Sequence, residues 1–468
     1  MNVVLVNCVG SRSFHPFEIR AVAPPLGILY IAAVLRNEGI EVSIIDQPAE
    51  GSSDGALVKR IISMNPDIVG FTILSTNCFN SAEAAKRIKE SNPEVITIFG
   101  GPHATINAER ILKKYSCVDY VMRGEGEYTT LEFVKSIEND VDLNEIDGLC
   151  FRENGRIIKK GSNVIEDLDT IPFVPYDMIE GNQYGNICGM HVDRVATILT
   201  SRGCPHSCTF CAVSSLSKGK CRFRSPENVV NEIEDLISRG FRNIVINDDN
   251  FTLNQRRVAQ FCELIRDRGL EFDWFCEGRV DDANLNTYRK MAKASCKLIY
   301  FGIESANEKI LEYYNKRINP RQSKMAVEKA RKAGIDVIIG TFILGAPNES
   351  LKEIGNTIKF ASSLEIDFPQ FNILSVRAGT KLWANFVNEG YIDEEKDWDG
   401  QIFVSDIHPN CVPKNLIQEK INEAYRSFTR RPYWVLKEAG RLFKSSFRRD
   451  ILWHNLDRID QVIQEIKV

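Results

Sequence analysis

The amino-acid sequence predicts an α/β protein with two successive series of βα units and a helical C-terminal region. Short apolar runs of strand length alternate with amphipathic stretches of helical length, first before residue 140 and again after residue 190. A proline-rich stretch separates the two series, as expected for a linker. The chain has 468 residues and is 43% hydrophobic, so it is long enough for two or three domains with substantial cores.

The first series, residues 1–140, predicts a doubly wound parallel sheet. Its strands are almost continuously apolar, which is typical of parallel strands that helices cover on both faces. The five expected strands are NVVLVN, VSIID, DIVGFTIL, VITIFGG and VDYVMRG. Ligands of such sheets bind beyond the carboxyl ends of the strands, here at the loops 75–77, 100–105 and 123–127. None of these loops is a G-x-G-x-x-G turn, so a dinucleotide is not favoured.

Residues 141–190 predict a hairpin followed by a linker. The stretch IDGLCFRENGRIIKKG has an Asn-Gly turn between two apolar runs, which is a strong hairpin signal. The stretch DLDTIPFVPYDMI is rich in proline and predicts an irregular connection. A domain boundary is therefore expected near residue 190.

The second series, residues 191–380, predicts a partial (β/α)6 barrel. Six strands are too few to close an eight-stranded barrel, so we expect an open barrel whose strand-end loops form the functional rim. Residues 381–468 are expected to be mostly helical. The six expected strands are VATILTS, NIVIND, FDWFCEG, KLIYFGIES, IDVIIGTFILG and DFPQFNILSV.

Three cysteines, Cys204, Cys208 and Cys211, follow the first strand of this barrel in the loop LTSRGCPHSCTFCAV. Their spacing brings three thiolates around one small metal body, and an open fourth position is typical of a catalytic rather than a structural site. A [4Fe–4S] cluster held in this way keeps one iron free for another ligand. A zinc ion completed by His206 or Cys221 is the alternative, which is less favoured because structural zinc sites usually have two paired cysteine knuckles.

With Phe210 before its third cysteine, this loop resembles the signature of the radical S-adenosylmethionine superfamily. The stretches INDDNFTLN, EGRVD, FGIES and ILGAPNES resemble the strand-end motifs that surround S-adenosylmethionine in that superfamily. The resemblance implies a [4Fe–4S] cluster on the three cysteines, with S-adenosylmethionine on the free iron. Reduction of the cluster would then give a 5′-deoxyadenosyl radical that abstracts hydrogen from an unreactive carbon. The cofactor contacts implied in this domain are Phe210, Asp248, Arg279 (to the carboxylate of S-adenosylmethionine), Glu304 and Ser305.

The first domain resembles the flavodoxin-like cobalamin-binding domain that is joined to such barrels. The stretches PPLGILYIAAVLRNEG, PDIVGFTILSTN, FGGPHAT, DYVMRGEGE and LDTIP carry this resemblance. In the loop DQPAEG, Pro48 stands where many cobalamin domains have a histidine that ligates cobalt, so we expect cobalt without a histidine ligand. His103 is an alternative ligand, although hydrogen bonding or loop packing is favoured for it. The implied cobalamin contacts are Ser75, Gly100, Gly101, His103, Gly124, Glu125 and Gly126.

The pairing of the two modules implies an enzyme, and within this family it favours a cobalamin-dependent C-methyltransferase. The radical would remove hydrogen from an unactivated carbon, methylcobalamin would supply the methyl group, and a second S-adenosylmethionine would remethylate cobalt. A ring-forming cyclase of the anaerobic porphyrin-ester type uses the same modules and stays open. So does a sensor that binds the cofactors without turnover. No catalytic side chain is identified from the sequence.

Charge and composition limit the partners. The 59 Lys+Arg and 63 Asp+Glu give a net charge of -4, so no global basic field attracts nucleic acid. We expect neither a membrane span nor a signal peptide, and the scattered cysteines predict a reducing, cytoplasmic location. We expect a small-molecule or lipid-like substrate and an electron donor such as flavodoxin or ferredoxin. Residues 426–449, with eight basic residues and one acidic residue, predict a helix packed on the barrel or, alternatively, a peripheral membrane contact.

Overall fold

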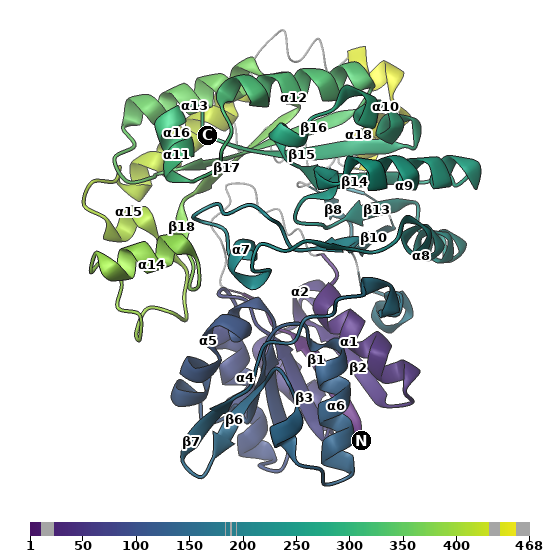
Figure 1. Ribbon diagram of the computed structural model, residues 1–468, viewed down its shortest axis with the longest axis vertical. Coiled ribbons are helices and arrows are strands. Elements are labelled where there is room, and N and C mark those ends of the chain that lie inside the picture. The colour runs from purple at the N-terminus through teal and green to yellow at the C-terminus, as the bar shows by residue number, and fades with distance from the viewer. Residues whose placement is uncertain (11–22, 183, 188–189, 193, 430–439, 455–468) are drawn as a thin grey trace. The chain divides into compact units, whose positions relative to one another are not determined.

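The computed structural model describes residues 1–10, 23–182, 184–187, 190–192, 194–429 and 440–454 (Figure 1). The chain divides into two compact units. The first holds the described residues up to 182 except Ala23, together with Arg377–Gln401, and the second holds Tyr184–Val376 and the described residues from Ile402 onward. The segment 377–401 thus belongs to the first unit, although it follows the barrel in sequence.

A seven-stranded sheet in the order β2-β1-β3-β4-β5-β6-β7 forms the centre of the first unit. Its first five strands are parallel, and their order is that of flavodoxin-like sheets, which confirms the predicted doubly wound domain. Val3, Val4 and Val6 of β1 are fully buried because helices cover both faces of the sheet (Figure 1). These strands are β1 (Asn2–Asn7), β2 (Glu41–Asp46), β3 (Ile68–Thr72), β4 (Ile96–Gly100) and β5 (Tyr120–Met122).

Four helices of this unit pack against one another in two pairs. α1 (Leu26–Asn37) packs against α6 (Gly126–Glu138), and α3 (Asp54–Ser63) packs against α4 (Cys78–Ser91). α5 (Pro102–Lys114) packs against the strands from β4 to β7. The short α2 (Gln47–Glu50) contains Pro48 in its first turn, where proline is tolerated because the first N–H groups of a helix have no intrahelical partner.

The predicted hairpin extends this sheet with two antiparallel strands, β6 (Leu149–Glu153) and β7 (Arg156–Lys159). Its turn residues Asn154 and Gly155 both have positive φ, at 47° and 74°. Two positive φ values define the tight turn that matches the twist of paired strands, and Asn-Gly adopts it most readily. The sequence signal and the backbone conformation therefore agree.

The segment 377–401 is held to α5 by side chains of both polar and aromatic type. It begins with α14 (Lys381–Asn388), whose first turn is capped by the Thr380 hydroxyl accepting from the Trp383 N–H at 3.0 Å. The indole of Trp398 is buried against the ring of His103, with ring centroids 5.7 Å apart. Asp399 accepts a hydrogen bond from the Tyr115 hydroxyl at 3.1 Å and pairs with Lys114.

The second unit contains six parallel strands in the order β10-β13-β14-β15-β16-β17. Among the described residues β10 and β17 are the two edges of this sheet, which confirms the six expected parallel strands and agrees with an open barrel. The strands are β10 (Val195–Ile198), β13 (Asn243–Ile246), β14 (Asp273–Gly278), β15 (Cys296–Glu304), β16 (Val337–Leu344) and β17 (Phe368–Ile373).

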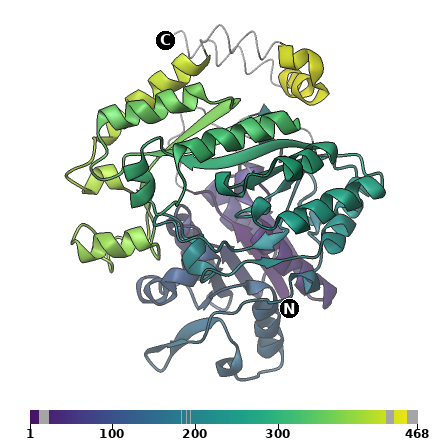
Figure 2. The same cartoon turned by 45° about the horizontal axis from the view of Figure 1, so that its top comes forward.

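Amphipathic helices follow these strands and cover the outer face of the sheet (Figure 2). Their start points are set by local capping: Ser225 caps α8, and Asn319 and Ser350 form capping boxes at α12 and α13. The covering helices are α8 (Pro226–Ser238), α9 (Gln255–Asp267), α10 (Leu285–Lys293), α12 (Pro320–Ala333), α13 (Leu351–Ser363) and α16 (Lys414–Thr429).

Side chains alternate between the two faces of this sheet. Trp274 of β14 packs edge-on against Phe251 and Phe261 on the side of α9. Phe275, the next residue, lies on the inner face in a buried apolar cluster with Leu298 and Val337. Phe447 of α18 (Ser446–His454) completes this inner cluster, with its ring centroid 5.5 Å from that of Phe275.

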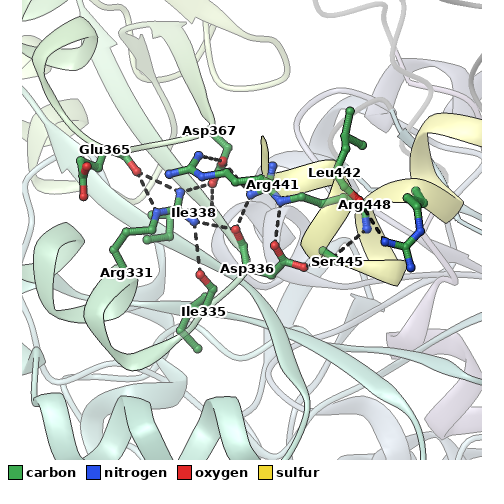
Figure 3. Close-up of polar contacts among 11 residues, drawn as sticks. Arg331, Ile335, Asp336, Ile338, Glu365, Asp367, Arg441, Leu442, Ser445 and Arg448 are labelled. Atoms are coloured by element: carbon green, nitrogen blue, oxygen red, sulfur yellow. Dashed lines mark hydrogen bonds and ion pairs between the residues drawn. The ribbon is translucent and has the colours of Figure 1, made fainter. Parts of the chain in front are cut away.

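The C-terminal helix is also bound to the barrel by a buried charge network (Figure 3). The carboxylate of Asp367 is fully buried and pairs with Arg331, with Arg441 at 2.6 Å and with Arg448 at 2.7 Å. Arg448 also pairs with Asp336 at 2.7 Å. The described part of the basic stretch 426–449 therefore uses two of its arginines to bind the barrel. No helix among the described residues has the length and apolarity needed to span a membrane.

Candidate cluster and cobalamin sites

The cysteine loop of the second unit is framed by a two-stranded hairpin after β10. β11 (Ser201–Arg202) pairs antiparallel with β12 (Arg222–Phe223), and the short α7 (Val213–Leu216) lies between them. The cysteines Cys204, Cys208 and Cys211 all fall in the connection between β11 and α7. This places them at the carboxyl end of the first barrel strand, where the sequence predicts the functional rim.

Gly203 determines how this loop leaves β11. Its φ is 93°, and a Cβ at this position would lie 2.3 Å from the carbonyl oxygen of Lys220. Only glycine avoids both the strained backbone conformation and the collision. The Ser217 hydroxyl then donates to the carbonyl of Cys204 at 3.3 Å, which ties the first cysteine to the returning chain.

Two neighbouring carboxylates hold the start of the loop from β13. The buried Asp248 accepts hydrogen bonds from the backbone N–H groups of Thr200 and Ser201, at 2.6 and 3.0 Å, and from both of their hydroxyls. Asp249 accepts from the Gly203 N–H at 3.0 Å. Four intrachain donors thus converge on Asp248, so the structure places it as a support of the cysteine loop. Its predicted contact with S-adenosylmethionine stays a prediction.

The far end of the loop rests on the residues that follow β15. The Thr209 N–H donates to the Tyr314 carbonyl at 2.9 Å, and the Thr209 hydroxyl donates to the Tyr313 carbonyl at 3.1 Å. The Phe210 ring packs edge-on against Tyr314, with centroids 5.3 Å apart. Phe210 therefore anchors the loop between its second and third cysteines.

The three cysteine side chains of the loop are buried or half-buried. Burial raises the pKa of the Cys204 and Cys211 thiols, an effect that the backbone N–H groups of His206 and Val213 partly offset. Among the described residues, no three His, Cys, Asp or Glu side chains converge on one point that could hold a single metal ion.

Arg279 brings a positive charge to the cysteine loop from the end of β14. One of its Nη atoms lies 3.8 Å from the Sγ of Cys208, and its other nitrogens bind Asp281 at 2.9 Å. It also donates to the Lys316 carbonyl at 2.9 Å. Arg279 therefore places a guanidinium beside the second cysteine of the loop.

Glu304 and Ser305, at the end of β15, are buried. Glu304 pairs with Lys316 at 2.6 Å, and a Cβ on Gly302 would lie 2.7 Å from both side chains. Gly302 therefore leaves the space that this ion pair fills. The Ser305 hydroxyl accepts from the Asn307 N–H at 3.1 Å and contacts Thr357. The predicted roles of both residues toward S-adenosylmethionine stay predictions.

Glu277 is a polar residue on the inner face of the barrel that was not among the site residues expected from the sequence. Glu277 lies on β14 on the same face as Phe275, and its side chain is exposed while its neighbours Cys276 and Gly278 are buried. Partial desolvation by the surrounding barrel raises the pKa of this carboxyl to about 7, with Asp249 and Glu304 adding to the effect and Lys316 opposing it. In the strand DWFCEG, Glu277 lies two residues after Phe275, so the two side chains are on the same face. This alternation is the sequence signal that identifies Glu277.

The carboxyl edge of the sheet in the first unit carries the residues expected to contact cobalamin. Gly101 has a φ of 97°, and a Cβ there would lie 3.1 Å from the backbone of Ile73. Leu74, just after β3, is 48% exposed at this edge and offers an apolar surface of the kind that a corrin face can contact. Gly100 ends β4, and Ser75 follows Leu74 in a half-buried position. The close approach of Ile73 explains Gly101, and the predicted contacts of this edge with cobalamin stay predictions.

His103 is enclosed rather than presented to a ligand. Its ring is buried against Trp398, and its Nδ1 lies 3.4 Å from the Asn107 amide nitrogen. Its Nε2 is buried without a hydrogen-bond partner in the described structure. Burial lowers the pKa of His103 to about 4, so the ring is neutral at physiological pH. This burial agrees with loop packing, one of the two roles favoured from the sequence, and the predicted contact of His103 with cobalamin stays a prediction.

The glycine-rich loop after β5 is explained by contacts within the chain. A Cβ on Gly124 would lie 2.2 Å from the carbonyl oxygen of Asn163, so the linker occupies the space beside it. The Glu125 carboxylate accepts from the Ile165 N–H at 2.7 Å. Gly126 begins α6 and lies against Ile31 of α1. This loop therefore attaches the linker to the sheet, and its predicted contact with cobalamin stays a prediction.

Comparisons with known protein families agree with both modules. The model of the Radical SAM superfamily matches residues 198–361, and that of the B12 binding domain matches residues 17–134. An uncharacterized methyltransferase of Pyrococcus horikoshii is 36% identical over 424 residues, which cover 89% of this chain and 90% of the relative. The anaerobic magnesium-protoporphyrin IX monomethyl ester cyclase of Rubrivivax gelatinosus is 28% identical, covering 88% of this chain and 74% of the relative.

Solved structures show the same fold at low sequence identity. OxsB, a cobalamin-dependent S-adenosylmethionine radical enzyme solved with aqua-cobalamin, has a TM-score of 0.71 and 16% identity, covering 99% of this chain and 80% of its own. TsrM, a radical S-adenosylmethionine methyltransferase from Kitasatospora setae, has a TM-score of 0.66 and 17% identity, covering 83% and 75%. The fold and the cysteine loop define a radical S-adenosylmethionine barrel joined to a B12-binding domain. The chain belongs to the cobalamin-binding radical S-adenosylmethionine enzymes, whose cofactors are a [4Fe–4S] cluster, S-adenosylmethionine and cobalamin.

Proposed function

We propose that this protein transfers a methyl group to an unactivated carbon of a small-molecule substrate. The observation that carries this proposal is the pairing of an open three-cysteine loop with a cobalamin domain in which Pro48 stands at the usual position of the ligating histidine. Among the described residues 23–182 the one histidine is His103, and its ring is buried against Trp398. The methyltransferase among the relatives from Pyrococcus horikoshii, at 36% identity, supports the same class.

The side chains of the barrel hold and tune the cofactor site. Cys204, Cys208 and Cys211 are proposed to supply the three thiolates, and Arg279 places a guanidinium 3.8 Å from the Sγ of Cys208. Asp248 and Gly203 fix the direction of the loop. The cluster, when bound, supplies the electron that cleaves S-adenosylmethionine.

The buried groups beyond β14 and β15 are proposed to position S-adenosylmethionine. Arg279 carries a positive charge that can pair with the carboxylate of S-adenosylmethionine, although Asp281 partly neutralises this charge. The Glu304–Lys316 pair and Ser305 give a preorganised polar surface with little freedom to move, because all three side chains are buried. Preorganisation of this kind is how a protein orients a reactive cofactor at low entropic cost.

Ring-forming oxidation is the second candidate function. The cyclase of Rubrivivax gelatinosus is 28% identical over 88% of this chain, so it shares both modules with this protein. A methyltransferase uses S-adenosylmethionine in two ways and forms both 5′-deoxyadenosine and S-adenosylhomocysteine. A cyclase forms only the first, so the pair of products separates the two functions.

The partners and the location of the protein follow from this function. An electron donor such as flavodoxin or ferredoxin is required, the acidic net charge disfavours nucleic acid, and a cytoplasmic location fits oxygen-sensitive chemistry on scattered free cysteines. Membrane contact through 426–449 stays a prediction. Exposure of 86% at Phe443 favours it, whereas Arg441 and Arg448 are already bound to carboxylates of the barrel.

The test of this function compares two cysteine variants after anaerobic reconstitution. Cys208→Ser removes a proposed ligand, while Cys221→Ser changes a half-buried thiol outside the triplet and serves as the matched control. We expect Cys208→Ser to lose at least 90% of both 5′-deoxyadenosine formation and cluster absorbance, and Cys221→Ser to keep both. Full cluster content and product formation in Cys208→Ser would show that the assignment is wrong.

A further inference from the structure

The hairpin that frames the cysteine loop has an unusual charge composition. Between Thr200 and Ser225 the sequence contains Arg202, Lys218, Lys220, Arg222 and Arg224 and no aspartate or glutamate. The whole chain, in contrast, has a net charge of -4. Positive charge is therefore concentrated in the segment that carries the three cysteines.

The basic residues of this hairpin divide into an anchoring and an exposed set. Arg224 is buried and pairs with Glu232 at 2.5 Å, so it anchors β12 to α8. Lys218 and Lys220 are exposed, and Arg202 and Arg222 are half-buried. Arg202 and Arg222 lie directly opposite one another in the β11–β12 ladder, which places two like charges side by side.

The stretch of chain that carries Lys218 and Lys220 is joined to the cluster loop by short contacts. The carbonyl of Lys220 is the atom that a Cβ on Gly203 would meet at 2.3 Å, and Gly203 directly precedes Cys204. The Lys220 N–H donates to the Ser217 carbonyl at 2.9 Å, and the Ser217 hydroxyl donates to the Cys204 carbonyl at 3.3 Å. A molecule that contacts Lys218 and Lys220 is thus bound beside the first cysteine.

The hairpin is also rigid enough to present a defined surface. The guanidinium of Arg257 lies 5.2 Å from the centre of the Phe223 ring, and it donates to the Thr200 carbonyl at 2.7 Å and to the Arg224 carbonyl at 3.2 Å. Both strands of the hairpin are therefore tied to α9 by one buried side chain. Fixed charges give faster and more selective encounter than charges on a mobile loop, because less ordering is needed on binding.

We propose that the exposed basic residues Lys218 and Lys220, with Arg202 and Arg222, form the docking surface for an acidic protein that carries one electron. The proposal rests on the cluster assigned to this family and deepens the electron-donor requirement of the proposed function. In the step served by this surface, one electron leaves the reduced carrier, which is oxidised by one unit, and enters the oxidised cluster, which is reduced by one unit. No covalent bond forms or breaks.

The test measures cluster reduction by a reduced, acidic flavodoxin in stopped-flow absorbance with full-length, cluster-loaded protein. The variant is Lys218→Glu/Lys220→Glu. The matched control is Lys324→Glu/Lys332→Glu, which makes the same change in net charge at two exposed positions of α12. We expect the second-order rate constant to fall by about 10-fold or more in the hairpin variant and by less than about 2-fold in the control, since steering by local charge changes association rates by 10 to 1,000-fold.

Three further readouts separate the causes of a negative result. Excess dithionite should reduce the cluster of wild type and hairpin variant to the same final extent, which shows that the cluster itself is intact. The wild-type rate should fall steeply with added salt, and that of the hairpin variant should fall less. Titration calorimetry with oxidised flavodoxin should show weaker binding to the hairpin variant alone.

An equal loss in the two variants, or an unchanged rate in the hairpin variant, would overturn the proposal. Loss of binding to anionic lipid vesicles in the hairpin variant with no change toward flavodoxin would overturn it as well, since the surface would then serve a membrane. The failure of the proposed methyl transfer is independent of these results, because cluster reduction is measured without substrate.

Discussion

Replacing Asp367 with asparagine tests the buried network that binds the C-terminal helix to the barrel. Asp367→Asn keeps the size of the side chain and removes the charge that faces Arg331, Arg441 and Arg448 (Figure 3). Removal of one member of a buried ion pair costs about 3–5 kcal/mol because the partner charge is left unbalanced. Arg331 and Arg441 retain 13% and 18% exposure and can gain some solvent, so we expect about 3 kcal/mol, the lower end of this range.

The pH dependence of this effect has a definite sign. Burial opposes the ionisation of Asp367, but the charges of Arg331, Arg448 and Arg441 outweigh it and hold its pKa below the usual range. The stabilisation is therefore fully present above about pH 4 and is lost as the pH falls through the lowered pKa. The difference in stability between wild type and Asp367→Asn should be constant from about pH 5 to pH 8.

The assay is denaturant unfolding of the full chain, combined with trypsin digestion at the basic sites near residues 441–449. Glu263→Gln is the matched control, because it breaks an exposed pair with Lys290 in the same unit and should cost less than about 1 kcal/mol. Trypsin should release the C-terminal segment faster from Asp367→Asn than from wild type. Equal stability of Asp367→Asn and Glu263→Gln, with equal digestion rates, would show that the buried network does not hold the C-terminal segment to the barrel.

Three other predictions follow from single positions. Gly203→Ala should reduce cluster incorporation severely because its Cβ meets the Lys220 carbonyl. The control Gly219→Ala, at a position with a φ of 73° and no atom within 4 Å of the added Cβ, should reconstitute normally. Equal iron content in the two variants would contradict this. Glu277→Gln should leave the free energy of unfolding unchanged below about pH 4 and raise it by about 1 kcal/mol above pH 7. The reason is that ionisation of the Glu277 carboxyl destabilises the folded wild type, while solvent screens part of this effect. A gain confined to acid pH would contradict this. His103→Ala should leave the absorption spectrum of bound cobalamin unchanged, and loss of a nitrogen-ligated spectrum in that variant would show that His103 ligates cobalt.

The architecture of this protein was accessible from its sequence because the relevant signals are local. Continuous apolar strands with helical crossovers predicted both parallel sheets, and the Asn154–Gly155 turn predicted the β6–β7 hairpin. The spacing of Cys204, Cys208 and Cys211 was visible for the same reason, since all three lie within one short loop.

The features that the sequence did not reveal depend on contacts between distant residues. Trp398 packs on His103 nearly 300 residues away, so nothing local indicated that 377–401 belongs to the first unit. The pair of Glu304 with Lys316 and the four hydrogen bonds to Asp248 likewise need the folded barrel. A single buried carboxylate in a strand-end motif has the same sequence signature whether it binds a cofactor or supports a loop.

In the proposed function, one protein uses S-adenosylmethionine both as a radical source and as a methyl donor to cobalamin. The most direct measurement incubates cluster- and cobalamin-loaded protein anaerobically with flavodoxin as reductant and methyl-labelled S-adenosylmethionine. We expect 5′-deoxyadenosine and S-adenosylhomocysteine to form together and the label to appear on cobalamin. Formation of 5′-deoxyadenosine with neither S-adenosylhomocysteine nor labelled cobalamin would contradict methyl transfer and favour the cyclase function.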